Sequence, residues 1–202
     1  MVSKYLTVSV SLLFFYLVTA YSTKCFAGSI DDMSFGEPNA PVSIIEYASF
    51  GCSHCAEFHI NTYPKIKKEF IETGKVKFIF RNFPLDTPSL AAAMIAHCAG
   101  AKKYFGMVEI FFRSQQQWGS ADNPLDALKK SARFGGMTNS KVDSCLENKQ
   151  LLEHIQNVAR HGQEKYKINS TPSFVINGKL ISGALPYKDF KKEINLALGH
   201  SD

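Results

Sequence analysis

The sequence predicts an α/β fold in which an all-helical segment interrupts the sheet, on three observations. Two apolar, β-branched runs, Val42–Ala48 and Val76–Arg81, are separated by a stretch of helix length. Residues 86–167 carry helical patterns and no strand pattern. A strand–turn–strand pattern around Asn177-Gly178 follows, and an Asn-Gly pair between apolar runs is a strong hairpin signal.

The first half of the predicted sheet surrounds one long helix. Val42–Ala48 is apolar without a polar alternation, which is typical of a strand buried on both faces. A helical pattern runs from Cys52 to about Thr73 and ends at Gly74, a favoured C′ residue, with Pro64 expected to kink its middle. The side chains expected to point inward from this helix are Phe58, Ile66 and Phe70. Because a helix connects the first two strands, they are predicted to pair in parallel.

The middle of the chain predicts five helices. Their expected ranges are Thr87–Ala99, Lys102–Gln116, Asn123–Gly135, Ser140–Glu147 and Gln150–Tyr166. Strands return at Ser173–Ile176 and Leu180–Ser182, and a last helix covers Pro186–Leu198. This order of elements is that of a thioredoxin fold with an inserted all-helical domain. The predicted thioredoxin-like domain comprises residues 28–85 and 168–202, and the insertion comprises residues 86–167.

The chemistry is expected at Cys52-Ser53-His54-Cys55, which follows the first strand and opens the long helix. A cysteine at a helix start lies among unpaired backbone N–H groups and near the positive end of the helix dipole. Those surroundings favour the thiolate, which is the form that attacks disulfides. The pair therefore predicts a redox-active dithiol.

Two other uses of a CxxC pair are less well supported. A structural zinc site needs about four ligands, and His54 and His59 lie on the same predicted helix, so they could not both join the cysteines around one ion. Haem attachment requires a histidine directly after the second cysteine, where this chain has Ala56. We therefore expect no metal and no other cofactor.

The N-terminus predicts export. Lys4 precedes a mostly apolar stretch of 16 residues, Tyr5–Ala20, which is short for a membrane span of about 20 residues. Residues 1–27 are predicted to be a signal peptide, with cleavage after Ala20 or Ala27, and an uncleaved membrane anchor is the alternative. The destination would be the periplasm, where disulfides persist.

The chain has a net charge of +5, with lysines scattered among acidic residues, so no nucleic-acid site is predicted.

Several segments resemble the DsbA family of secreted thiol oxidases. They are the run Gly36-Glu37-Pro38-Asn39-Ala40-Pro41, the strand with Glu46 that leads to Phe50-Gly51-Cys52-Ser53-His54-Cys55, and the tail Thr171-Pro172-Ser173-Phe174-Val175-Ile176-Asn177-Gly178. The resemblance covers most of the chain after the leader. Ser53 differs from the proline that the best-known members carry at this position.

The resemblance implies a role for each residue of the site. Cys52 would be the attacking cysteine and Cys55 the resolving one, while His54 would donate to the Cys52 thiolate; the alternative for His54 is a solvated helix-start residue. Thr171-Pro172 would form the cis-proline loop that binds substrate. Glu46 would be a buried acid that exchanges protons with Cys55, and its alternative is an exposed position at a sheet edge.

Cys98 and Cys145 are predicted to form a second, structural disulfide, with two free buried thiols as the alternative. The predicted function is an enzyme that forms disulfide bonds in reduced or unfolded exported polypeptides and is reoxidised by a membrane partner. It is expected to be a monomer. The alternatives are a periplasmic disulfide reductase or isomerase, or a non-enzymatic chaperone-like binding module on the same scaffold.

Overall fold

The computed structural model describes residues 32–199, which contain a mixed sheet with the strand order β1-β3-β2-β4-β5. The central strand β2 (Val42–Ala48) is parallel to β3 (Val76–Asn82) and antiparallel to β4 (Ser173–Ile176). The predicted parallel pair is therefore confirmed. Strands β1 (Met33–Phe35) and β5 (Lys179–Ser182) form the two edges, each antiparallel to its neighbour.

Strand β1 was not predicted from the sequence. It has three residues, Met33–Phe35, and all of them are at least partly exposed, so no alternation or apolar run marks it. The strand exists because its backbone pairs with β3, where Met33 lies opposite Phe80. Such a strand depends on the neighbouring strand more than on its own residues.

The helical stretch after β2 has the predicted extent but a different interior. It consists of α1 (Ser53–Glu57), the π-helical turn η1 (Phe58–Thr62), α2 (Tyr63–Ile66) and a second π-helical turn, η2 (Lys67–Ile71). Pro64 has no backbone N–H, so it cannot donate the helical hydrogen bond to the carbonyl four residues earlier. The interruption expected at Pro64 takes the form of these turns on either side of it. Phe58, Ile66 and Phe70 are buried, as predicted.

The segment between β3 and β4 is helical, and no strand occurs in it. The helices are α3 (Thr87–Cys98), α4 (Ala101–Arg113), α5 (Gln115–Gly119), α6 (Pro124–Phe134), α7 (Asn139–Leu146) and α8 (Lys149–Tyr166). The prediction of one helix through Gln116 is wrong. The chain leaves the helix at Ser114, whose hydroxyl donates to the Ile110 carbonyl at 2.8 Å, and α5 begins at the next residue.

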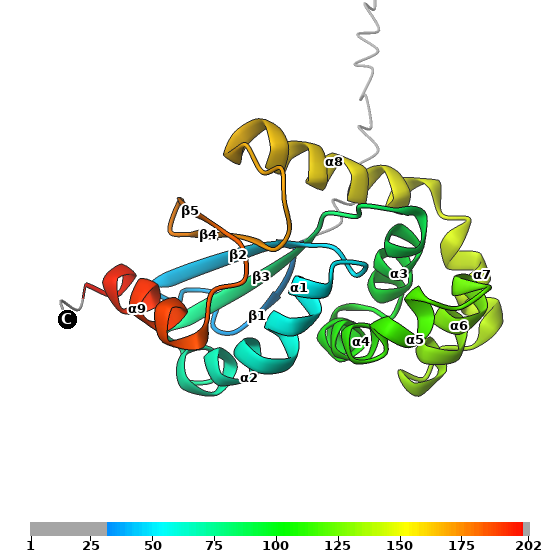
Figure 1. Ribbon diagram of the computed structural model, residues 1–202, viewed down its shortest axis with the longest axis horizontal. Helices are drawn as coiled ribbons and strands as arrows, with labels where there is room; N and C mark the ends of the chain where they lie inside the picture. The colour runs from blue at the N-terminus through cyan, green and yellow to red at the C-terminus, as the bar shows by residue number, and fades with distance from the viewer. Residues whose placement is uncertain (1–31, 200–202) are drawn as a thin grey trace, which may run out of the picture.

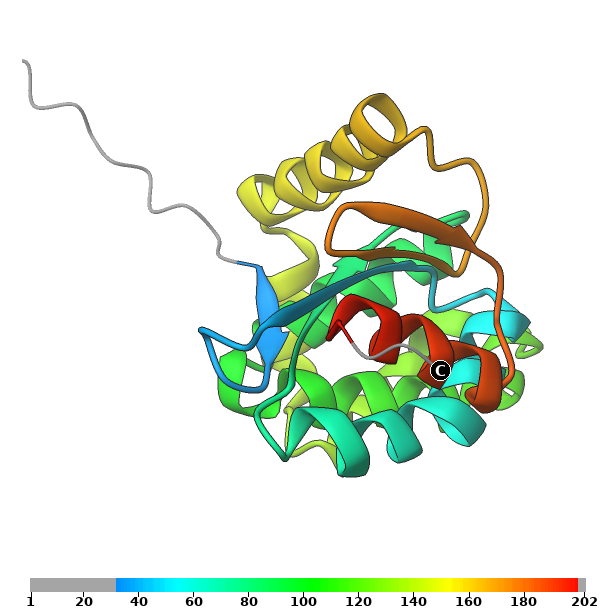
Figure 2. The ribbon, with the colours of Figure 1, turned by 90° about the vertical axis from the view of Figure 1, so that its left-hand side faces the viewer.

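Helices cover both faces of the sheet, as the buried parallel pair requires. Figure 1 shows α8 above the sheet and α2 and α9 (Tyr187–Ala197) below it. Figure 2 shows the same two layers from the side. The remaining helices, α3 to α7, gather beyond the C-terminal end of β2, next to α1 (Figure 1). The end of β2 and the start of α1 therefore lie where the sheet and the helical cluster meet.

The hairpin between β4 and β5 has the predicted turn. Asn177 has φ of 44° and Gly178 has φ of 90°, and the flanking residues Ile176 and Lys179 are paired. Positive φ at both central residues is the requirement of a type I′ turn.

The predicted leader, residues 1–27, lies outside the described residues. Among residues 32–199, no helix combines the length and the apolar character needed to span a bilayer.

Candidate active site

Cys52 lies at the junction between β2 and α1. It is the N-cap residue of α1, with an extended backbone (φ −82°, ψ 120°), and its carbonyl accepts the N–H of Ala56 at 3.1 Å. The loop before it passes close to α3, so that a Cβ atom at Gly51 would collide with the side chains of Ser89 and Asp86. Any other residue at position 51 would displace these two side chains, so glycine lets the loop pass close to α3 and deliver Cys52 to the first turn of the helix.

Several hydrogen bonds hold the sulfur of Cys52 as an anion. In the thiolate form, the sulfur accepts from the Cys55 thiol, from the Thr171 side chain and from the backbone N–H groups of Cys55 and His54. Together these donors lower the pKa of Cys52 to about 5, even though partial burial acts in the opposite direction. The mechanism is stabilisation of the charged form by hydrogen bonding, in the amide-rich first turn of a helix.

The loop that contains Thr171 faces the same sulfur. The Thr171–Pro172 peptide bond is cis, and the Thr171 carbonyl lies 3.2 Å from Cys52 Sγ, where it accepts a hydrogen bond from the thiol. The Thr171 hydroxyl is buried and has no hydrogen-bond partner of its own within residues 32–199. Once the thiol has lost its proton, this hydroxyl is the side-chain donor of Thr171 that stabilises the sulfur.

Cys55 has the opposite character. It is completely buried, and both cysteines of the pair are free thiols in this structure. Burial, the hydrogen bond to Cys52 and the nearby charge of Glu46 all raise the pKa of the Cys55 thiol well above its usual range. The site is therefore an asymmetric dithiol, in which the partly exposed sulfur is charged and the buried sulfur is protonated.

Glu46 lies on the central strand, between β3 and β4, with no exposed surface. The alternative that placed it at an exposed sheet edge is therefore wrong. Burial raises the pKa of the Glu46 carboxyl, while the neighbouring His59 acts in the opposite direction. Its Oε2 lies 2.7 Å from His59 Nε2, and its Oε1 has no hydrogen-bond partner in the described part of the chain.

His59 is a site residue that sequence reasoning missed, since it was considered only as a zinc ligand. It lies in η1, and its side chain is 3% exposed. The ring stacks on Phe112 of α4 at a centroid distance of 4.5 Å. A histidine seven residues after Cys52, on the helix face that turns toward the sheet, was the available signal.

The side chain of His54 points away from the sulfur that it was predicted to stabilise. It is 72% exposed, and its Nδ1 lies 3.7 Å from a carboxylate oxygen of Glu57. The contribution of His54 to Cys52 comes from its backbone N–H. The geometry therefore fits a solvated residue at a helix start better than an imidazole donor.

Gln115 connects the helical cluster to the redox loop and was not identified from the sequence. Its Nε2 donates to the carbonyl oxygens of Phe50 at 2.6 Å and Cys52 at 2.9 Å. These contacts orient the backbone on both sides of Gly51. No local pattern reveals the residue, because it acts across 63 residues of sequence.

Cys98 and Cys145 form the predicted second disulfide, which links α3 to α7 with a Cα–Cα distance of 6.1 Å. The alternative of two free thiols is therefore wrong.

No cluster of three or more histidine, cysteine or acidic side chains that could hold a metal occurs within residues 32–199.

Comparisons with known proteins agree with this geometry. Residues 29–195 match the family model described as Thioredoxin. The crystal structure of alpha-DsbA1 from Wolbachia pipientis superposes with a TM-score of 0.79, at 34% identity over 84% of this chain and 92% of that one. This chain is a DsbA-like member of the thioredoxin family.

Two further DsbA-like relatives differ in how much of their length is matched. Disulfide bond formation protein D of Bacillus subtilis is 28% identical over 81% of this chain and 75% of that protein. A relative from Rickettsia bellii, whose name refers to a protein-disulfide oxidoreductase, is 28% identical over 73% of this chain. The chain spans only 58% of the length of that relative.

The hydroxyl of Thr171 gives a prediction specific to this DsbA-like site. Replacing Thr171 with valine removes one donor to the thiolate, so the pKa of Cys52 should rise by about one to two pH units. The alkylation rate of the reduced protein with iodoacetamide, measured from pH 3 to 9, gives the titration midpoint. Thr73→Val, the same isosteric change in the turn that follows η2, is the control and should keep the midpoint near pH 5. An unchanged midpoint in Thr171→Val would contradict the role of the hydroxyl.

Proposed function

We propose that this protein is a thiol oxidase that introduces disulfide bonds into reduced, exported polypeptides. The observation that carries the proposal is the stabilised anion at Cys52. A low pKa at the attacking cysteine stabilises the reduced protein, and a protein whose reduced form is stabilised gives its own disulfide away. Electrons would then flow from substrate thiols to the Cys52–Cys55 pair.

The reaction proceeds in two exchanges. A substrate thiolate attacks Cys52 Sγ, the Cys52–Cys55 bond breaks, and Cys55 leaves with the electron pair and takes up a proton. A second substrate thiolate then attacks the substrate sulfur of the mixed disulfide, and Cys52 leaves as a stable thiolate. The substrate has gained a disulfide, and the protein pair has gained two electrons. An oxidising partner in the membrane, as the resemblance implies, would return the pair to the disulfide.

Substrate is proposed to bind beside the cis Thr171–Pro172 bond as an extended chain, since backbone pairing of this kind recognises unfolded polypeptides without a fixed sequence. The carbonyl of Thr171 lies at the sulfur, at 3.2 Å from Cys52 Sγ. A peptide that occupied this loop would therefore hold its own cysteine next to Cys52.

The compartment is also a proposal. The leader pattern in residues 1–27 and the disulfide between Cys98 and Cys145 both favour an oxidising location such as the periplasm. N-terminal sequencing of the protein from a periplasmic fraction would give a start at Tyr21 or Gly28. Recovery of the full-length chain from the cytoplasm would contradict export.

A redox titration against glutathione tests the direction of electron flow. We expect a potential well above that of thioredoxin, which is about −270 mV. We also expect the oxidised protein to restore disulfides in a reduced, unfolded model substrate. A potential near the thioredoxin value would support the reductase alternative instead.

Glu46 is proposed to supply the proton that Cys55 takes up, and to accept it again on reoxidation. Glutamine at this position cannot transfer a proton, so Glu46→Gln should slow thiol exchange at Cys55 by about 100-fold, within the usual range for general acid–base catalysis. Stopped-flow exchange from pH 5 to 9 measures the effect. Glu37→Gln, a change at an exposed acid, is the control, and equal rates for both variants at every pH would exclude the proton transfer.

A further inference from the structure

We propose that His59 connects the buried Glu46 to solvent, so that protons enter and leave the redox site through a pocket between η1–α2 and α4. This inference rests on the proposed function and deepens it. His59 would act through Glu46, not directly on either sulfur.

Proton supply is a problem that the burial of this site creates. Glu46 has no exposed surface and Cys55 has none either, so neither group can exchange a proton with bulk water directly. After Glu46 gives its proton to Cys55, a bare carboxylate remains in the interior of the protein, and a buried charge of that kind is unfavourable. The carboxylate therefore needs another source of protons.

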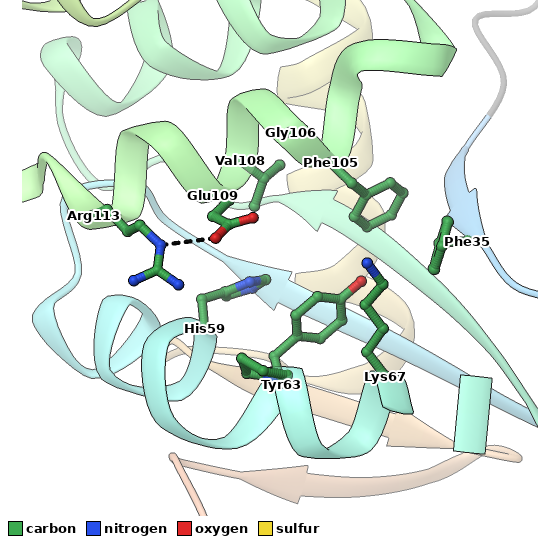
Figure 3. A pocket seen from close by; sticks show the side chains of 10 residues that line it. Phe35, His59, Tyr63, Lys67, Phe105, Gly106, Val108, Glu109 and Arg113 are labelled. Atoms are coloured by element: carbon green, nitrogen blue, oxygen red, sulfur yellow. Dashed lines mark hydrogen bonds and ion pairs between the residues drawn. The ribbon is translucent and has the colours of Figure 1, made fainter. Parts of the chain in front are cut away.

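A pocket of about 350 Å³ leads to the residue that could supply them. His59 forms part of its wall and hydrogen-bonds Glu46 at 2.7 Å. Figure 3 shows His59, Tyr63 and Lys67 on one side of the pocket and α4 on the other. At the mouth, Arg113 Nε donates to Glu109 Oε1 at 2.8 Å. This volume is large enough to admit water to the imidazole, and the charged mouth favours hydration.

The geometry assigns a different role in proton transfer to each ring nitrogen of His59. Because Nε2 is bound to Glu46, exchange with water must use Nδ1. In the oxidation of substrate, Nε2–H passes its proton to the Glu46 carboxylate, and Nδ1 takes one from water in the pocket. In reoxidation of the protein, the same steps run in reverse, and one proton leaves. The total proton count balances, because each proton gained at Cys55 is replaced from solvent.

The other side chains around His59 do not offer an alternative path for protons between Glu46 and the pocket. Phe112 and Tyr63 flank the imidazole, at centroid distances of 4.5 and 5.0 Å. Burial raises the pKa of Tyr63. The ionisable side chains that face the pocket besides His59 are Tyr63 and Lys67 from its own helical stretch and Glu109 and Arg113 from α4. Within residues 32–199, His59 is the only residue whose side chain hydrogen-bonds the Glu46 carboxylate.

The test combines removal of the imidazole with closure of the pocket. In His59→Ala, the rate of exchange between the protein pair and glutathione should fall about tenfold, and added imidazole should restore it. Gly106 lies on α4 in the pocket wall with open space at its Cβ position. Adding Gly106→Leu to His59→Ala should prevent the restoration, and adding Gly106→Ala, the matched control, should not.

His59→Gln tests whether the slower exchange in His59→Ala comes from a lost proton relay or from a damaged fold. The amide can keep the hydrogen bond to Glu46 but cannot relay a proton, so this variant should also be about tenfold slower and should not respond to imidazole. The pKa of Cys52 should stay near 5 in every variant. Wild-type rates in both His59 variants from pH 5 to 9, or restoration that Gly106→Leu leaves undiminished, would overturn the inference.

The exchange is measured in both directions, which separates this inference from the proposed function. A wild-type potential near that of thioredoxin would contradict the oxidase proposal. The relay would still be judged by the variants, because protons must cross whichever way the electrons flow.

Discussion

Serine at position 55 is expected to stop turnover while leaving Cys52 reactive. The largest contribution to the low pKa of Cys52 is the hydrogen bond from the Cys55 thiol, and a serine hydroxyl can still donate there. The variant cannot form the internal disulfide, so oxidation of a dithiol peptide should fall by at least about 1000-fold, as expected when one member of a catalytic pair is lost. Incubation with glutathione disulfide should instead accumulate a mixed disulfide at Cys52, visible by mass spectrometry.

Alanine at the same position separates the two roles of Cys55. Cys55→Ala loses the donor as well as the resolving sulfur, so its Cys52 titration midpoint should rise above that of Cys55→Ser. Cys52→Ser is the control for reactivity. Its remaining thiol, Cys55, is fully buried and has a raised pKa, so it should form almost no adduct. Adduct formation at the wild-type rate in Cys52→Ser would contradict the assignment of the attacking sulfur.

The sequence predicted the parts of the site that depend on local patterns. Val42–Ala48 is a strand because it is apolar and β-branched, and Cys52 meets the helix start because the pattern changes there. The turn at Asn177-Gly178 follows from the need for positive φ at both residues. The redox pair and the fold class could therefore be read from one-dimensional information.

The features that the sequence did not predict depend on contacts between distant segments. β1 is a strand because β3 lies beside it, and its own three residues carry no signal. Gln115 reaches the redox loop only because the helical cluster packs against α1. His54 was expected to act through its imidazole, but the helix turns that side chain outward. The pattern of the first turn did not predict this direction, because it leaves His54 beside the buried Cys55 in the sequence without showing which way the imidazole points.

Glu46 shows how the two kinds of information combine. Its place within an apolar strand predicted an unusual carboxyl, but not which group compensates it. The compensation comes from His59, 13 residues later and on the helix that covers the strand. Burial raises the pKa of Glu46 and His59 lowers it, and these opposing effects suit a group that must both give and accept a proton.

The disulfide between Cys98 and Cys145 is expected to support the fold and not the chemistry. It closes a loop across 47 residues, for which the chain-entropy model gives roughly 4 kcal/mol of stabilisation. Cys98 ends α3 and Cys145 lies in α7, so the bond joins two helices of the cluster beyond the sheet. Cys98→Ala/Cys145→Ala should therefore unfold with a free energy about 4 kcal/mol lower in urea, measured with the redox pair kept oxidised.

The same double variant should keep the Cys52 titration midpoint near pH 5, since the donors to that sulfur come from α1 and the Thr171 loop. The matched comparison is the free energy of unfolding of both proteins in the presence of a reductant. Dithiothreitol opens both disulfides of the wild type but only the redox pair of the variant, so the difference in stability between the two proteins should disappear when both are reduced. A difference that persists under reduction would mean that the alanine side chains, and not the lost cross-link, cause the destabilisation, because packing defects do not depend on the redox state.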